Sequence, residues 1–319
     1  MKRKAIAWRV ALFFNLIIIF TVVPGVAGQS SSGDERVFPT GFVVRGEFLR
    51  FFDRCGGIET FGYPLTTEFE EAGRGVQYFH RGRMELYPEN PPEQRVVLGQ
   101  LGELLTTPES PLAGPASRPD RRFFPETGHT VAAAFLSYFE ARGGAGLFGY
   151  PITEMMVENE RIVQYFQRAR LEWHPDNPSG LRVRLGKLGE IYLDQFPPPP
   201  EARDLSGSGN RRVALPEVTS VEVVASTSYP FAGQNQPQTL YVFVYDQDGT
   251  PLAGAQVRAV IHFPGGDREI ALTEANELGL SWQVFSVGQV SVGETVTIEV
   301  MVSYGGVEGT TQTSFLVWL

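Results

Sequence analysis

The stretch Phe61-Gly62-Tyr63-Pro64-Leu65-Thr66 recurs as Phe148-Gly149-Tyr150-Pro151-Ile152-Thr153, 87 residues further along the chain. The repetition extends in both directions from these hexapeptides. Residues 41–105 align with residues 128–192 without a gap, and 31 of the 65 aligned positions are identical. A repetition of this length indicates one structural unit used twice, and it decides the fold of this part of the chain.

Each unit carries the same local patterns. In the first copy, apolar residues at Val44, Phe48, Leu49 and Phe52 follow helical spacing and predict an amphipathic helix. The helix is expected to stop at a Gly-Gly pair, as a left-handed C-cap requires. An alternating run then predicts a strand or a tight hairpin. Such a small α+β module is only marginally stable alone, so we expect the two copies to pack on each other.

Composition and periodicity divide the 319-residue chain into seven segments. The predicted fold class is multidomain, with two small α+β repeats followed by an all-β immunoglobulin-like sandwich. The segments are a signal peptide (1–28), a flexible N-terminal segment (29–37), α+β repeat 1 (38–105), a Pro-rich connector (106–120), α+β repeat 2 (121–195), a Pro/Gly/Ser linker (196–215) and the sandwich (216–319). Period-two alternation places the sandwich strands at 219–226, 239–245, 255–263, 268–273, 279–285, 295–302 and 310–317.

The N-terminus indicates export. Four cations, Lys2, Arg3, Lys4 and Arg9, precede an apolar run, and small residues follow it, as in a secretory signal peptide. The run is 13 residues long, shorter than the ~20 residues of a membrane-spanning helix. We expect a secreted, extracellular protein that is associated with the cell surface. An uncleaved signal segment is the alternative, and it would provide the only membrane contact.

The charge balance excludes one class of partner. The chain has 27 Lys and Arg against 36 Asp and Glu, a net charge of −9, which becomes −13 once the four N-terminal cations are removed. Such an acidic surface argues against nucleic acid, whose binding depends on neutralising phosphates. Lys187 is then the one remaining lysine, and we interpret this as a compositional bias. No nucleophile, metal-ligand or cofactor motif is evident, so we expect a protein that is not an enzyme and binds no cofactor.

Polar residues of the alternating run are the candidate ligand-binding residues. Both copies carry them at equivalent positions: Gln77, Arg81, Arg83, Glu85, Gln164, Arg168, Arg170 and Glu172. Alternate residues of a strand share one face, so these side chains could form a polar row that binds glycan hydroxyls or carboxylates through arginine. The competing interpretation is that the Arg–Glu pairs only hold each repeat together.

A calcium site in the sandwich is a further alternative. Acidic residues are expected in loops at one pole of it, at Asp246, Asp248, Glu274, Glu277 and Glu308. Oxygen ligands suit calcium. However, no complete calcium-loop signature is present, and acids that shape turns explain the pattern more simply, so we predict no metal site.

Two family resemblances follow from these motifs. The order helix, Gly-Gly, Phe-Gly-Tyr-Pro, Gln-Tyr-Phe and closing Leu-Gly-x-Leu-Gly resembles LGFP-type repeats of secreted bacterial envelope proteins, with Phe61 and Phe148 in place of the signature leucine. The segment from Asp246 to Val257 resembles bacterial immunoglobulin-like domains of the invasin/intimin or carboxypeptidase-regulatory kind. The first resemblance implies cell-wall association, and the second implies a stalk-like or adhesive context.

The sequence alone leaves three functions open. The first is a non-enzymatic envelope protein whose repeats bind cell-wall glycan or a surface partner, with the sandwich as spacer or adhesive module. The second is a cell-wall-acting glycan hydrolase or its accessory subunit, using Glu85 and Glu172 or Glu103 and Glu190 as acid and base. The third is an adhesin-like module that binds another envelope protein through sandwich edges.

Overall fold

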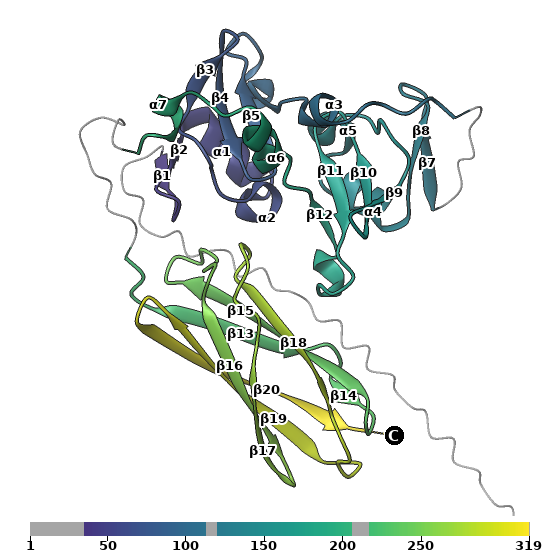
Figure 1. Ribbon diagram of the computed structural model, residues 1–319, viewed down its shortest axis with the longest axis vertical. Coiled ribbons are helices and arrows are strands. Elements are labelled where there is room, and N and C mark those ends of the chain that lie inside the picture. The colour runs from purple at the N-terminus through teal and green to yellow at the C-terminus, as the bar shows by residue number, and fades with distance from the viewer. Residues whose placement is uncertain (1–34, 113–119, 206–216, 319) are drawn as a thin grey trace, which may run out of the picture. The chain divides into compact units, whose positions relative to one another are not determined.

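The computed structural model describes residues 35–112, 120–205 and 217–318 (Figure 1). The predicted signal peptide lies outside the described residues, as do parts of the predicted connector and linker. Antiparallel sheets dominate the chain that is described. Two α+β repeats and an all-β sandwich were expected, and strand predominates over helix in the structure, with one large core in residues 38–185 and another in residues 232–317.

Short elements build the first copy of the repeat. A two-stranded β1-β2 ladder and two helices precede a four-stranded antiparallel sheet of order β3-β4-β5-β6, and a further helix follows. The elements are β1 (Glu35–Val37), β2 (Val43–Arg45), α1 (Gly46–Arg54), α2 (Gly57–Phe61), β3 (Phe69–Glu71), β4 (Arg74–Phe79), β5 (Gly82–Leu86), β6 (Val96–Leu98) and α3 (Leu101–Leu105).

The second copy contains the same elements in the same order. They are β7 (Arg121–Phe124), β8 (His129–Ala132), α4 (Ala133–Ala141), α5 (Gly144–Phe148), β9 (Met156–Glu158), β10 (Arg161–Tyr165), β11 (Arg170–Trp173), β12 (Val183–Leu185) and α6 (Leu188–Gln195), and then α7 (Pro200–Arg203). The bounds of α1 and α4 differ by the same 87 residues that separate the two sequences. The sequence repetition is therefore also a repetition of secondary structure.

Three local expectations need correction. The predicted helix begins later than expected, because Val44 lies in β2, and Gly46 at the junction has φ +55°, which interrupts regular helix. Part of the N-terminal segment predicted to be flexible is β1, which pairs with β2. Part of the predicted linker is α7, whose Ala202 is fully buried and accepts a hydrogen bond from the amide of Thr67.

The two copies pack by exchanging their last helices. α6 of the second copy contacts β4 and β5 of the first. Conversely, the backbone of α3 approaches the second copy so closely that a Cβ on Gly102 would lie 1.8 Å from the carbonyl oxygen of Phe166. The equivalent Cβ on Gly189 would lie 1.9 Å from the carbonyl oxygen of Phe79. These reciprocal contacts make the pair approximately two-fold symmetric.

The exchange creates hydrophobic cores that both copies share. One core combines phenylalanines of both copies, with Phe52 stacked on Phe79 and Phe139 stacked on Phe166. A second core joins Tyr78 of the first sheet to Leu188 of α6. In the first copy, α1 packs on β5 and β6 of its own sheet, while α6 of the second copy packs on β4 and β5. The other copy therefore completes part of the core.

The C-terminal part is a β-sandwich of two sheets. The strands are β13 (Val221–Thr227), β14 (Phe231–Ala232), β15 (Pro237–Asp246), β16 (Gln256–Phe263), β17 (Gly266–Ala271), β18 (Leu280–Ser286), β19 (Thr295–Tyr304) and β20 (Val307–Val317). One sheet has the order β13-β15-β18 and the other β14-β20-β19-β16-β17. Inward residues of both sheets, such as Val242 and Ile298, form one core. The seven expected strands are present, whereas the two-residue β14, parallel to β20, was not predicted.

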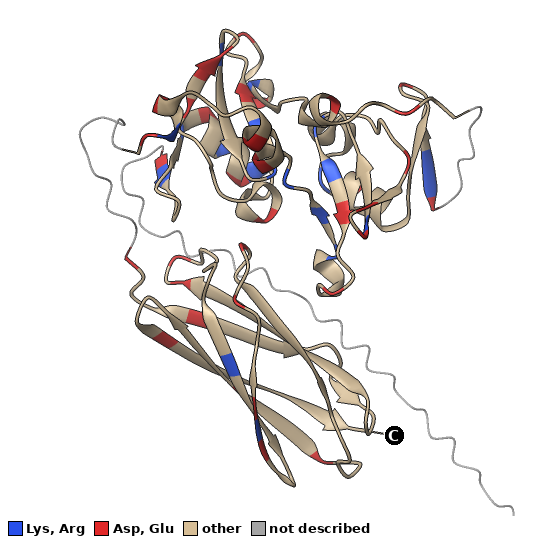
Figure 2. Cartoon of the chain, viewed as in Figure 1, with Lys and Arg blue, Asp and Glu red and all other residues tan. Residues whose placement is uncertain are grey.

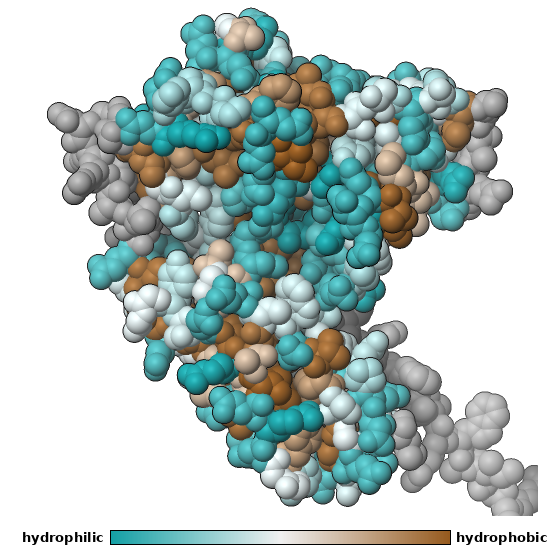
Figure 3. All heavy atoms as spheres, viewed as in Figure 1, coloured by the Kyte–Doolittle hydropathy of each residue, from teal (hydrophilic) through white to brown (hydrophobic). Residues whose placement is uncertain are grey.

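Apolar side chains also reach the surface of the sandwich. Val224 and Val284 remain 56% and 54% exposed on its outer strands. Figure 3 shows hydrophobic residues in separate patches among hydrophilic ones on the visible face. Scattered exposed apolar residues are ordinary in folded proteins, so these carry no functional conclusion.

Candidate functional site

The two candidate glutamines are buried structural residues. The Gln77 side-chain amide donates to the carbonyl oxygens of Val43 and Thr66, each at 2.9 Å. Gln164 repeats this with Thr130 and Thr153, at 2.6 and 2.8 Å. Each glutamine thus ties the sheet of its copy to the preceding strand, and neither faces a ligand site.

The expected single row of polar side chains is wrong. Gln77 is the cross-strand partner of Met84, whereas Arg83 is the partner of Tyr78. Directly paired residues share a face and neighbouring residues do not, so Gln77 and Arg83 project from opposite faces of the sheet. Arg81 lies in the turn between β4 and β5 rather than on a strand, because Gly82 already begins β5.

Arg83 and Glu85 form a closed ion-pair cluster in the first copy. Arg83 donates to Glu85, to Glu71 at 2.8 Å and to the hydroxyl of Tyr78 at 3.1 Å. Burial works against the charge, but Tyr78 and Glu85 raise the pKa of Arg83 above its ordinary value. The cluster lies over Gly99, where a Cβ would be 2.4 Å from a Glu85 oxygen. The first glycine of the Leu-Gly-x-Leu-Gly motif therefore makes room for the Arg–Glu pair.

The second copy builds the same cluster around Arg170. Arg170 donates to Glu172, to Glu158 at 3.2 Å and to the hydroxyl of Tyr165 at 3.0 Å, and Gly186 leaves the matching space. Because both copies retain this arrangement, the structural interpretation of the Arg–Glu pairs explains it directly.

What covers the cluster differs between the copies. In the first copy, the ring of Tyr192 from α6 stacks on Tyr78 at 5.7 Å between centroids and lies 5.9 Å from the Arg83 guanidinium. The residue equivalent to Tyr192 in the first copy is Leu105. Leucine has no ring to stack on Tyr165, and a cleft of about 340 Å³ opens beside Arg170 and Glu172.

Charged residues of both signs line this cleft. They include Glu158, Arg161, Arg170, Glu172, His174, Arg184, Lys187 and Glu190 of the second copy, with Arg81 and Glu277. Figure 2 shows acidic and basic residues next to one another along β11 and β12. Five of the lining residues differ from their counterparts in the first copy. The differing residues are Asn159, His174, Arg184, Lys187 and Ile191, which stand where the first copy has Ala72, Tyr87, Val97, Gln100 and Leu104.

Histidine and arginine hold Glu172 as an anion. His174 Nε2 lies 3.1 Å from Glu172 Oε2, and the guanidinium of Arg161 lies 2.5 Å from His174 Nδ1, which makes Nδ1 the acceptor and Nε2 the donor. Burial opposes the charge on Glu172, but His174 and Arg170 lower its pKa to about 2. The carboxylate stays ionised at neutral pH.

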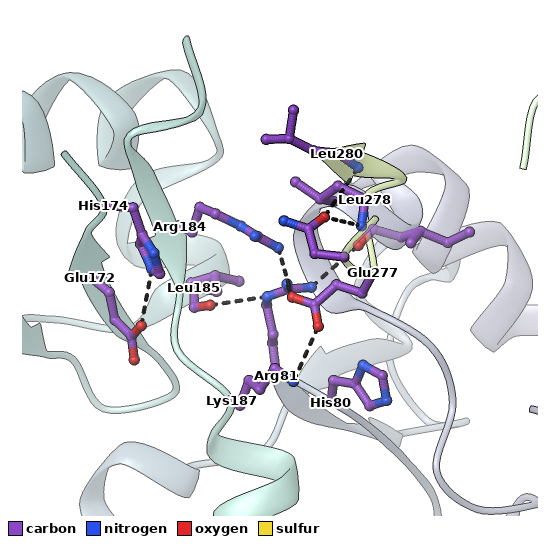
Figure 4. A network of polar contacts seen from close by, with 12 residues as sticks. His80, Arg81, Glu172, His174, Arg184, Leu185, Lys187, Glu277, Leu278 and Leu280 are labelled. Atoms are coloured by element: carbon purple, nitrogen blue, oxygen red, sulfur yellow. Dashed lines mark hydrogen bonds and ion pairs between the residues drawn. The ribbon is translucent and has the colours of Figure 1, made fainter. Parts of the chain in front are cut away.

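Three cations meet at Glu277, which belongs to the loop before β18 (Figure 4). Its Oε1 accepts from Arg81 and from Arg184 at 3.0 Å, and its Oε2 lies 3.1 Å from Lys187 Nζ. Burial again opposes the charge, and the three cations together lower the pKa of Glu277 to about 2. Glu277 was expected only as one of several acidic loop residues.

The two turn arginines have different environments. Arg81 is 2% exposed and donates to the carbonyl oxygen of Leu185 at 3.0 Å as well as to Glu277. Desolvation, with the charge of Arg184, lowers the pKa of Arg81 to about 10. Its counterpart Arg168 is at the surface and donates to the carbonyl oxygen of Gly146 at 3.0 Å. Of the eight candidate residues, Arg81, Arg170 and Glu172 come together at the cleft.

Two of the acidic residues considered for calcium have other roles in the fold. Asp246 accepts from the amides of Asp248 and Thr250 and so shapes its turn, while Glu274 accepts from Gln256. Within residues 35–112, 120–205 and 217–318, no group of three or more His, Cys, Asp or Glu could hold a metal ion. No helix among these residues is long and apolar enough to cross a membrane.

A larger hollow of about 790 Å³ lies elsewhere on the second copy, beside Phe124, Tyr150 and Glu140. Its charged pair, Arg122 and Glu140, is 3.4 Å apart, and both side chains are more than half exposed. Exposed ion pairs of this kind contribute little energy. The hollow contains none of the buried polar groups that distinguish the smaller cleft, so the smaller cleft is the better candidate site.

Comparison with known proteins does not identify a family. No family model and no curated protein matches the chain. Several solved structures resemble parts of it. A DUF4785 family protein from Legionella pneumophila is 15% identical over 33% of this chain, with a TM-score of 0.26. The Lin-41 filamin domain is 17% identical over 32% of this chain and 95% of its own, with a TM-score of 0.23. The chain spans 31% of the Legionella protein.

Proposed function

We propose that this chain is an exported, non-enzymatic protein of the bacterial cell envelope, and that the cleft of its second repeat binds cell-wall glycan or a surface partner. One observation carries the proposal. The same ion-pair cluster is closed by an aromatic ring in the first copy and opens into a charged cleft in the second. If the cluster only held each repeat together, nothing would require it to be covered in one copy and open in the other.

The chemistry of the cleft fits a hydrophilic ligand. Arg170 Nε and Arg184 Nε are buried donors without a hydrogen-bond partner among the described residues. These two atoms are enclosed by protein, whereas the terminal nitrogens of the cleft cations can donate to a ligand hydroxyl or carboxylate. The cleft lining contains no Phe, Tyr or Trp, so recognition would depend mainly on hydrogen bonds and charge rather than on stacking.

The remaining elements of the proposal rest on sequence resemblance. The repeats would be LGFP-like, and the sandwich would be an immunoglobulin-like domain of the bacterial type, acting as spacer or adhesive module. The predicted signal peptide supports secretion and a position at the cell surface. A protein partner bound through the sandwich edges is the alternative to a glycan ligand.

Glycan hydrolysis is the enzymatic alternative, and the cleft supports it less well. A general acid needs a carboxyl group that is protonated near neutral pH. Glu172, with a pKa of about 2, cannot supply that proton. Its counterpart Glu85 is tied to Arg83 and to the hydroxyl of Tyr87.

Sedimentation with isolated cell walls tests the proposed function. The purified protein is compared with the double variant Asn159→Ala/His174→Tyr, which restores the first-copy residues Ala72 and Tyr87 at the cleft. Ala72 already has φ +49°, close to the +48° of Asn159, so alanine fits this backbone. We expect about tenfold weaker retention of the variant, because it removes the Asn159 amide and replaces the His174 imidazole by a bulkier phenol at the cleft. The matched control is Arg122→Gln/Glu140→Gln, which should sediment like the parent. Parent protein that stays in the supernatant would refute wall binding.

A further inference from the structure

Glu277 is held as a bound ligand would be held. Its two oxygens are divided among three cations, with Arg81 and Arg184 on Oε1 and Lys187 on Oε2. Arg81 and Arg184 are both buried, at 2% and 8% exposure. Lys187 also pairs with Glu190 at 3.1 Å, so two carboxylates face three cations. Buried charges need partners, and the two buried arginines share the single carboxylate of Glu277.

A rigid turn presents Glu277 to these cations. The side chain of Asn276 accepts from the amide of Leu278 at 2.8 Å, and the amide of Gly279 donates to the Asn276 carbonyl at 2.8 Å. A Cβ on Gly279 would lie 2.2 Å from the carbonyl oxygen of Val244, so only glycine fits there. Leu278 packs with Leu280 in a small apolar cluster. The carboxylate is therefore preorganised (Figure 4).

The cations that bind Glu277 occur at only one of the two positions related by the approximate two-fold symmetry of the described repeats. Positions equivalent to Arg184 and Lys187 carry Val97 and Gln100 in the first copy, and the counterpart of Arg81 is the partly exposed Arg168, which donates to the carbonyl of Gly146 instead. The symmetry-related position can therefore not hold a carboxylate in this way. The three cations therefore come together at one of the two symmetry-related positions, at the edge of the cleft proposed above.

The three cations that bind Glu277 remain accessible from the cleft. The Lys187 side chain is 44% exposed, and all three cations line the cleft together with Glu277. The Nε atom of Arg184 is buried and has no hydrogen-bond acceptor among the described residues. A ligand in the cleft can thus approach the same cations that now bind Glu277.

We propose that Arg81, Arg184 and Lys187 form a carboxylate-binding site, that Glu277 is its internal occupant, and that a carboxylate of the ligand takes the place of Glu277. This names the ligand class as an acidic envelope polymer, and to that extent it rests on the proposed function. Glu277 then has two roles, since it fixes the loop before β18 to the repeats and competes with the ligand.

Chemical rescue tests the site itself, using acetate as the probe. In Glu277→Ala the two buried arginines lose their carboxylate partner and Lys187 keeps only Glu190. We expect Tm to fall by roughly 5–10 °C. Acetate should then raise Tm of the variant about 2–4 °C more than chloride does at equal ionic strength. The parent protein should respond equally to both salts. An unchanged Tm, or equal effects of acetate and chloride on the variant, would overturn the proposal. If the alanine variant does not fold, Glu277→Gln is judged by the same criterion.

Cell-wall sedimentation of Glu277→Gln tests the exchange with a ligand. Removing the competing charge should increase wall retention several-fold over that of the parent protein, and equal or weaker retention would overturn the exchange. The two experiments fail separately. Acetate rescue without any wall binding, by parent or variant, would keep the carboxylate site but reject both the envelope ligand and the proposed function.

Discussion

The two copies of the repeat share their elements, their cores and their buried glutamines, but they differ on the outer face of the sheet. In the first copy, Tyr192 seals the cluster around Arg83. In the second, the cluster around Arg170 borders a cleft that contains Lys187 and Glu277. Many residues that close the shared fold are the same in both copies, such as the pair Gly102 and Gly189, although some core positions differ, as at Met84 and Leu171. The differences that matter for the cleft lie at its lining and at the residue that covers the ion-pair cluster, Tyr192 or Leu105.

The largest expected effect concerns whether one copy folds without the other. Residues 35–112 alone would leave the outer face of their sheet without α6, and Tyr78 and Val76 would be exposed. We expect this polypeptide to lack a cooperative unfolding transition, whereas residues 35–205, which contain both copies, should show one by circular dichroism. Cooperative unfolding of the single copy would mean that the helix exchange is dispensable.

The second prediction concerns the closing glycines. Gly102→Ala and Gly189→Ala would each place a methyl group against a backbone carbonyl of the other copy. We expect each to destabilise the protein by about 3 kcal/mol or more, because backbone cannot move aside as a side chain can. Urea unfolding would measure this. The control is Gly146→Ala in α5, which meets nothing within 4 Å and should be neutral or slightly stabilising.

A third prediction separates the two turn arginines. Arg81→Ala removes a buried cation that binds Leu185 and Glu277, and we expect a loss of about 3–5 kcal/mol in the free energy of unfolding. Arg168→Ala, its counterpart at the surface, should change stability by less than about 1 kcal/mol. Similar losses from the two variants in denaturant titrations would contradict the asymmetry between the two turns.

The smallest effect depends on pH. Because the folded-state pKa of Glu172 is about 2, below its ordinary value of 4.5, its contribution is fully present above pH 4.5 and is lost as pH falls toward 2. Glu172→Gln should therefore be less stable than the parent at pH 6, by about 2–3 kcal/mol, and the difference should shrink by pH 3. Urea unfolding at both pH values measures it.

The control for this titration is Glu140→Gln. Glu140 pairs with Arg122 at the surface, where both side chains are more than half exposed. Replacing it should change stability by less than about 0.5 kcal/mol at either pH. A difference for Glu172→Gln that stays constant from pH 6 to pH 3 would show that packing, not charge, explains its loss of stability.

Much of the fold could be predicted because local patterns determine it. Helical spacing around Phe48 and Phe52, alternation through Tyr78 and the strands of the sandwich all appear in the structure. The strand at Val44 was missed because one strand residue happens to continue the helical spacing. The polar row was wrong because a turn at His80 and Arg81 breaks the alternation that placed Gln77 and Arg83 together.

The candidate site could be predicted only in part. Arg170 and Glu172 were found because both copies carry them, and repetition draws attention to what is retained. Lys187 and Glu277 were noted, as a compositional bias and as a loop acid, but nothing local connects two residues that are 90 positions apart. A comparison of the two copies position by position was the available signal, since it singles out Arg184 and Lys187 as new charges.

The sequence by itself determined the duplication, the elements of each copy and the strands of the sandwich, because periodicity and turn residues act over a few neighbouring positions. Only the tertiary structure decided that the closing helices are exchanged, because Leu188 and Leu101 have the same apolar pattern whichever sheet they cover. It also decided that Glu277 meets Arg81, Arg184 and Lys187. Charges attract over short distances whatever their separation along the chain, so that choice depends on the whole fold.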